Sequence, residues 1–312
     1  MTVFLPEGYG GQTPAAACCP TTPEGWREAA ARETVLWADA ALCDTAHNLW
    51  VTLPGLRGMI PREEGALGIA EGTLRDIALI ARVGHPVCFT VMRMTHDADG
   101  RPLAILSRRR AQELCRRQYL DLLRPGDVIP VRITRLESFG AFCDVGCGIS
   151  SLIPIDRISV SRIFHPGDRF TVGQDLKAVV HFRDDRGRLH LTHKELLGTW
   201  EENAADFTPG ETVTGRVRTV ESYGSFIELT PNLAGLAEPC PGVTAGLQAT
   251  VFIKSILPEK MKVKLIVVDT CPARGPLSSG MRFWGDHMDF WQYSPPGAVK
   301  NVFTDFTAPP EE

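Results

Sequence analysis

The 312-residue sequence contains no long hydrophobic run and no strong excess of charge of either sign. A membrane-spanning helix needs roughly 20 consecutive apolar residues, so we expect no membrane segment. The first residues, MTVFLPEGYGGQTP, lack the basic and apolar parts of a signal peptide, which favours a cytoplasmic protein. The formal net charge of −4 argues against a protein that coats nucleic acid through bulk charge.

Motifs of common catalytic and metal sites are also missing. The sequence has no GxxxxGK[ST] phosphate loop and no HExxH metal motif, and its GYGG stretch does not open a strand–helix unit. The nine cysteines show no framework spacing, and Cys143 and Cys147 have no second Cys or His pair nearby. We therefore expect reduced thiols, no metal ion, no cofactor and no enzymatic activity.

Positive charge is concentrated near the middle of the chain. The helix-like stretch 107–124 contains six arginines against two acidic residues, a net charge of +4. Two interpretations remain open for this connector: its arginines contact phosphates, or they form a solvated helix face. The arginines concerned are Arg108, Arg109, Arg110, Arg116 and Arg117.

The chain repeats itself three times. RPGDVIPVRITRLESFGAF and TPGETVTGRVRTVESYGSF share a Pro-Gly-acid turn, an alternating strand and an aromatic pair, and a weaker copy precedes them. Short strands rich in Val and Ile, punctuated by Gly, Pro and Asp, are typical of all-β domains, and five strands in about seventy residues favour a closed barrel. The expected segments are an N-terminal extension with a short helix (1–33), repeats at 34–110, 124–197 and 207–270, a basic helical linker (111–123), an acidic linker (198–206) and a tail (271–312).

The stretches SFGAF and SYGSF place two aromatic rings three residues apart. In a strand, residues i and i+3 point to opposite faces, so two simple core positions would not have this spacing. The intervening glycine suggests a bulge or bend that brings both rings to one surface. The alternative is that one or both rings fill the barrel core, as most aromatics do.

With RPGDVIPVRITRLESFGAF, SLIPIDRI and DDRGRLHLTHKEL, the chain resembles the S-one-type RNA-binding repeat family, and as a whole it is similar to short three-repeat ribosomal members of Gram-positive bacteria. The resemblance implies three OB-fold barrels that bind RNA through the aromatic pair and an acid and an arginine in the last hairpin. The implied RNA-binding residues are Phe139, Phe142, Asp184 and Arg188 in the central repeat, Tyr223, Phe226 and Lys262 in the third, and His47, Trp50, Asp97 and Arg101 in the first. Pro154 stands where the family often has His.

Two functions are compatible with these features. The first is a single-stranded RNA or mRNA-binding protein of the translation apparatus, at the small ribosomal subunit. The second is a scaffold whose degenerate repeats dock a ribosome, polymerase or ribonuclease and bind RNA weakly or not at all. We expect a monomer, with helices near 22–33 and 107–122. The aromatic tail at 280–293 should pack on the third repeat through Trp284 and Trp291, because five aromatics in eleven residues are too apolar for a free tail.

Overall fold

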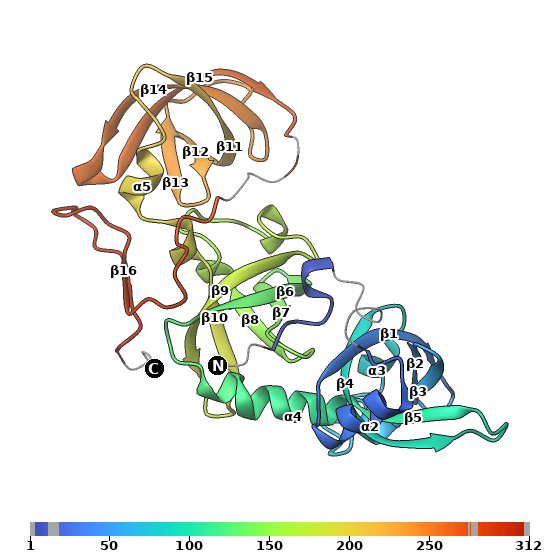
Figure 1. The fold of residues 1–312 in the computed structure, drawn as a ribbon. Coiled ribbons are helices and arrows are strands. Elements are labelled where there is room, and N and C mark those ends of the chain that lie inside the picture. The colour runs from blue at the N-terminus through green and yellow to red at the C-terminus, as the bar shows by residue number, and fades with distance from the viewer. Residues whose placement is uncertain (1–3, 12–18, 274, 276–279, 309–312) are drawn as a thin grey trace. The chain divides into compact units, whose positions relative to one another are not determined.

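The computed structural model describes residues 4–11, 19–273, 275 and 280–308. Its main elements are three closed five-stranded barrels, which confirms the all-β prediction (Figure 1). Barrel one comprises β1 (Leu36–Cys43), β2 (Leu49–Leu53), β3 (Leu56–Ile60), β4 (Pro86–His96) and β5 (Pro102–Ser107). Barrel two comprises β6 (Val128–Glu137), β7 (Gly140–Asp144), β8 (Ser150–Pro154), β9 (Asp175–Arg183) and β10 (Leu189–Thr192). Barrel three comprises β11 (Thr212–Glu221), β12 (Gly224–Thr230), β13 (Leu233–Ala237), β14 (Gln248–Leu257) and β15 (Lys262–Cys271).

Strands such as β6 show the period-two burial pattern expected in a barrel wall, whereas β4 and β5 contain runs of consecutive buried residues. In β6, Val131 and Ile133 are almost fully buried, whereas Thr134 is exposed. In barrels one and three the first strand pairs with both the second and the fourth strand. In all three barrels the third strand pairs in parallel with the fifth. This pairing leaves no free sheet edge, so alternate residues face either the barrel interior or its outer surface.

Four α-helices accompany the barrels among the described residues: α2 (Pro23–Ala31), α3 (Ile77–Ile80), α4 (Arg108–Gln118) and α5 (Trp200–Ala204). The helices expected near 22–33 and 107–122 are confirmed as α2 and α4, and the Thr22 hydroxyl caps α2 by accepting from the Gly25 N–H. The segment expected as an acidic linker contains α5, whose Trp200 is buried. In the part of the chain that the structure describes, no helix is both long and apolar enough to cross a membrane.

The chain divides into two compact units. The first contains residues 1–123, 130–132 and 144–150, and therefore barrel one, α2, α4 and the loop after β7. The second contains residues 124–129, 133–143 and 151–312, and therefore most of barrel two, barrel three and the C-terminal segment. We describe each unit by itself.

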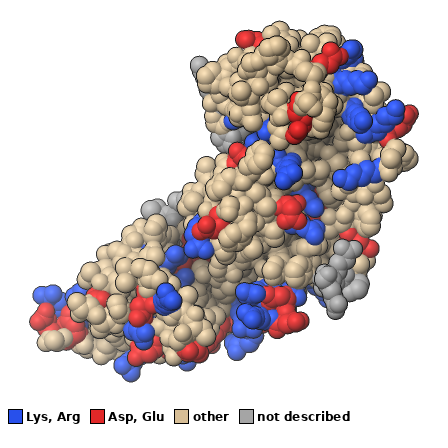
Figure 2. All heavy atoms as spheres, turned by 180° about the vertical axis from the view of Figure 1, so that it is seen from behind, with Lys and Arg blue, Asp and Glu red and all other residues tan. Residues whose placement is uncertain are grey.

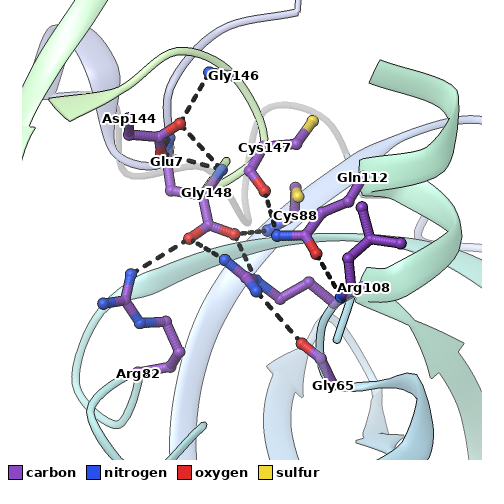
Figure 3. Close-up of polar contacts among 11 residues, drawn as sticks. Glu7, Gly65, Arg82, Cys88, Arg108, Gln112, Asp144, Gly146, Cys147 and Gly148 are labelled. Carbon is purple, nitrogen blue, oxygen red and sulfur yellow. Dashed lines mark hydrogen bonds and ion pairs between the residues drawn. The ribbon is translucent and has the colours of Figure 1, made fainter. Parts of the chain in front are cut away.

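The first unit contains a buried ion pair that uses the first arginine of the connector. Arg108 donates from Nε and Nη2 to the Glu7 carboxylate at 2.7 and 2.9 Å, and both side chains are about 95% buried (Figure 3). Arg82 lies 3.5 Å from the same carboxylate, and the Cys88 N–H donates to it. Burial of the Glu7 carboxyl would raise its pKa, but the charge and hydrogen bonds of Arg108 outweigh that effect and hold the pKa below its usual value.

A second buried carboxylate, Asp144, adjoins this pair. It accepts from the backbone N–H groups of Glu7, Gly146 and Gly148 at 2.7 to 3.0 Å (Figure 3). Burial, together with the negative charge of Glu7, raises the pKa of Asp144 to about 7. The loop after β7 is therefore fixed to the Glu7–Arg108 pair through main-chain hydrogen bonds.

These contacts correct one interpretation of the connector. Arg108 is unable to contact phosphates because it is buried against Glu7. Arg109 pairs with Glu64 and Glu113 at 2.8 and 2.9 Å, and its side chain is 30% exposed. Only the last three connector arginines, Arg110, Arg116 and Arg117, lie on the exposed face of α4.

The C-terminal segment packs within the second unit, partly as expected. It forms a small antiparallel pair, β16 (Phe290–Gln292) and β17 (Phe303–Asp305). Trp291 is 7% exposed and belongs to a core cluster that includes Leu233 of barrel three and Leu196 beside barrel two. Trp284, which we expected to be buried as well, is 74% exposed. Of its two tryptophans, the segment therefore buries only Trp291. It packs against residues of barrel three and against residues beside barrel two.

This difference predicts opposite outcomes for the two tryptophans. Trp291→Leu should lower the free energy of unfolding of the second unit by about 1–3 kcal/mol, because a buried indole is replaced by a smaller side chain. Trp284→Leu should change it by less than about 0.5 kcal/mol, because little of that side chain is removed from water. Urea unfolding followed by hydrogen exchange of β13 and β16 measures both, and equal effects of the two substitutions would contradict this packing.

Candidate nucleic-acid interface

The SFGAF stretch is a hairpin and not a bulged strand. Ser138 and Phe139 form the two-residue turn between β6 and β7, and Phe142 is the third residue of β7. Because Phe139 lies in the turn, the alternation of a strand does not apply to it. The two rings meet edge to face with their centroids 5.9 Å apart. Both rings therefore reach one surface, and the bend that allows it is the turn itself.

Gly140 is required by the close approach of the neighbouring strand. A Cβ atom at this position would lie 2.6 Å from the Ile153 carbonyl oxygen and 3.0 Å from Leu152 Cδ1. Any side chain would push β7 away from β8 at the level of the aromatic pair. The glycine thus lets Leu152 lie directly over the start of β7.

The aromatic pair lies outside the barrel core. Phe139 is 54% exposed and Phe142 is half-buried, while their neighbours Ala141 and Cys143 are fully buried. The guanidinium carbon of Arg135 lies 4.5 Å from the centre of the Phe142 ring, within the range of a cation–π contact. An exposed ring with an arginine on its face combines a stacking surface with positive charge.

The β9–β10 hairpin holds Asp184 and Arg188 next to each other. The Arg188 Nε donates to Asp184 Oδ2 at 2.8 Å, and the N–H groups of Arg186 and Arg188 donate to Asp184 Oδ1. The backbone hydrogen bond from Arg188 is the main reason why the pKa of Asp184 lies far below its usual value. Asp184 is therefore an anion that positions Arg188, whose side chain is 63% exposed.

Leu152 joins the aromatic pair to this hairpin. It lies over Gly140 on one side and pairs in register with His190 on the other. The His190 Nε2 in turn lies 3.4 Å from Asp184 Oδ2. A continuous row of outward side chains therefore runs from Phe139 to Arg188. The row includes three residues that we did not predict from the sequence, Arg135, Leu152 and His190. The outward places of Leu152 and His190 in alternating strands were an available signal, whereas Arg135 has the parity of the buried Val131 and Ile133 and gave none.

Barrel three has an aromatic pair like that of barrel two but has no hairpin with an acid and an arginine. Tyr223 is 61% exposed, Phe226 is half-buried, and their rings meet edge to face at 6.2 Å. A Cβ at Gly224 would lie 2.2 Å from the Ala237 carbonyl oxygen, so this glycine too allows a close approach of strands. Leu236 pairs in register with Lys264, whereas the expected Lys262 lies at the start of β15, opposite Leu257. Lys264 therefore takes the place that His190 has in barrel two.

Barrel one lacks the exposed pair. His47 adopts a left-handed backbone conformation, and its Nε2 lies 3.9 Å from Asp76. The Trp50 indole N–H donates to Asp44 at 3.0 Å, and Arg57 covers the Trp50 ring at 4.3 Å.

The last hairpin of barrel one also differs from that of barrel two. Asp97 accepts the backbone N–H of Arg101, as Asp184 does for Arg188. The Arg101 side chain, however, lies 3.8 Å from Asp99, and both of these side chains are about 70% exposed. The hairpin turn is therefore similar in the two barrels, but the arginine is not held by the equivalent acid.

The composition of the chain and one face of its surface show how charge is distributed. On the face drawn in Figure 2, basic and acidic side chains alternate over the surface. This distribution agrees with the near-balanced composition of 33 basic and 37 acidic residues. Because the two signs of charge are nearly balanced in the chain, we expect contact with a polyanion to rely on positioned cations such as Arg188 more than on bulk attraction.

Comparisons with known proteins place the central repeat. Residues 122–194 match the family model described as S1 RNA binding domain. The small ribosomal subunit protein bS1 of Leuconostoc lactis is 30% identical over 184 residues, which cover 57% of this chain and 42% of that protein. The bS1 homolog of Bacillus subtilis (strain 168) is 35% identical over 123 residues, covering 39% of this chain and 32% of the homolog. The matches thus span less than half the length of either relative.

One solved structure matches much of the chain at low sequence identity. A multidomain protein with nucleic acid binding domains from Streptococcus pneumoniae covers 76% of this chain and 74% of its own, at 13% identity and a TM-score of 0.25. The resemblance indicated by the sequence is confirmed by the family match: residues 122–194 carry the signature of the S1 RNA-binding domain family, and the chain is related in sequence to small ribosomal subunit protein bS1.

Proposed function

We propose that this protein binds single-stranded RNA on the outer faces of barrels two and three. The observation that carries the proposal is the exposed edge-to-face pair Phe139–Phe142, joined by one row of side chains to the Arg188 that Asp184 positions. Aromatic rings offer stacking surfaces to unpaired bases of any sequence, and an arginine beside them follows the phosphates. The site is sequence-tolerant because every base has a π face.

The relatives suggest where such RNA is held. Their names place them in the small ribosomal subunit. We infer that this chain acts in the cytoplasm as an mRNA-binding protein at that subunit, with no catalytic step. Barrel two would provide the strongest site, because barrel three has no counterpart of the Asp184–Arg188 hairpin: its β14 and β15 are joined through Pro258–Lys260.

A second candidate function applies to barrel one. His47 and Trp50 are engaged by Asp76 and Asp44, so they offer less open ring surface than the pairs of the other barrels. We infer that barrel one serves as a protein-docking module, as a scaffold at the ribosome requires. The two functions are compatible within one chain.

A titration of labelled oligo-U tests the proposal. We expect a dissociation constant in the micromolar range or tighter, and a logarithmic salt slope of about −0.7 for each phosphate that is neutralised. The same RNA annealed into a duplex is the control and should bind more weakly, because its bases are not available for stacking. Lack of binding to oligo-U at low salt would leave only the scaffold function, which cosedimentation with small ribosomal subunits would then test.

A further inference from the structure

A second pair of rings lies beside Asp184. Phe182 of β9 and His190 of β10 are opposite each other across the hairpin, and their rings are stacked with centroids 4.4 Å apart and planes 5° from parallel. Both side chains are half-buried and point outward, because the alternate residues Leu189 and Leu191 are buried in the barrel. The pair is therefore a surface feature and not a part of the core.

This ring pair continues the row of outward side chains that begins at Phe139. His190 pairs in register with Leu152, which lies over Gly140 at the start of β7. The His190 Nε2 also lies 3.4 Å from the carboxylate that holds Arg188. Rings, an aliphatic spacer, rings and an arginine thus follow one another around the same side of barrel two.

Barrel three shows that the barrel does not need these rings. Its register places Lys264 opposite Leu236, where barrel two has His190 opposite Leu152. The partner of Lys264 on the adjacent strand is Ser255, where barrel two has Phe182. Two barrels of the same topology therefore carry either a stacked ring pair or a serine and a lysine at these outward positions. Folding does not explain why barrel two has rings there.

We propose that Phe182 and His190 form a second stacking platform, on which another base of the RNA strand extends the existing stack while Arg188 contacts an adjacent phosphate. This proposal rests on the proposed function and deepens it. The first stacking platform is the ring pair Phe139–Phe142, and Leu152 lies between the two platforms. The ligand is an unpaired stretch of RNA long enough to reach both.

The first test compares oligo-U of four and twelve nucleotides. In His190→Ser and Phe182→Leu, the affinity for the twelve-nucleotide RNA should fall about tenfold, the loss expected for one stacked base. The affinity for the four-nucleotide RNA, which is held by the first platform alone, should stay within twofold. Phe164→Ala is the matched control, because Phe164 is a 61% exposed phenylalanine of the same barrel that lies outside the row; it should bind both RNAs as the unaltered protein does.

The second test measures binding on the unaltered protein, and a variant serves only to assign its signals. In NMR spectra, the ring protons of His190, assigned through His190→Ser, should move upfield on addition of twelve-nucleotide oligo-U because a stacked base exerts a ring current on them. The ring signals of His165, which lies in the loop after β8, should not move. A stationary His190 signal together with variants that bind normally would overturn the second platform while leaving RNA binding intact. Absence of any binding would overturn both proposals.

Discussion

Replacing Phe139 and Phe142 together by alanine should weaken the binding of single-stranded RNA by about 2–6 kcal/mol, which corresponds to one stacked base for each ring. The rings are outside the core, with Phe139 54% exposed, so the change removes stacking surface and leaves the barrel interior intact. Truncation of one buried phenylalanine lowers the free energy of unfolding by roughly 3–5 kcal/mol. The double change should lower it by much less, and the melting temperature should fall correspondingly little. Titration of oligo-U and thermal unfolding must be measured on the same protein.

The matching pair in barrel three is the natural control for this prediction. Tyr223 and Phe226 have the same edge-to-face geometry, but their barrel lacks the acid-and-arginine hairpin. Their replacement by alanine should therefore cost less binding than the change in barrel two. If the altered barrel-two protein melted early while its folded fraction bound RNA normally, Phe139 and Phe142 would be structural residues and the interface would have to be sought elsewhere.

Arg108→Met should lower the free energy of unfolding of the first unit by about 3–5 kcal/mol, because it leaves the Glu7 carboxylate buried without its main partner. The Arg108 side chain is 5% exposed and the Glu7 side chain 4%, so water is unable to replace the lost hydrogen bonds. Denaturant unfolding, with hydrogen exchange of β4 and α4 as the local probe, measures the loss. Binding of oligo-U by barrels two and three should persist under conditions where the second unit stays folded.

Two further variants separate charge from packing in this cluster. Arg116→Met on the same helix removes a 57% exposed guanidinium and should change stability by less than about 0.5 kcal/mol. The double change Glu7→Met with Arg108→Met should be less destabilising than Arg108→Met alone, because no unpaired charge is left in the interior. Equal losses for the single and double changes would show that packing, and not the ion pair, stabilises the unit.

Much of the fold was predictable from local patterns. Alternation marks strands such as β6, where Val131 and Ile133 face inward, and Thr22 before Pro23 marks the start of α2, because these signals act over a few residues. Repetition of the same pattern three times indicated three barrels. The aromatic pairs were also found from the sequence, although their placement in a hairpin turn was not, since the spacing alone does not distinguish a turn from a bulge.

Contacts between distant residues were decided only by the tertiary structure. Glu7 and Arg108 are 101 positions apart, so the sequence of the connector allows phosphate contacts or a solvated face for all five arginines, and only the tertiary structure buries Arg108. Trp284 and Trp291 have the same chemistry, and only the path of the C-terminal segment buries one and exposes the other. The row through Leu152, His190 and Phe182 likewise arises because barrel closure brings β8, β9 and β10 side by side. A linear sequence specifies which side chains point outward on each strand, but strand pairing determines which of them become neighbours.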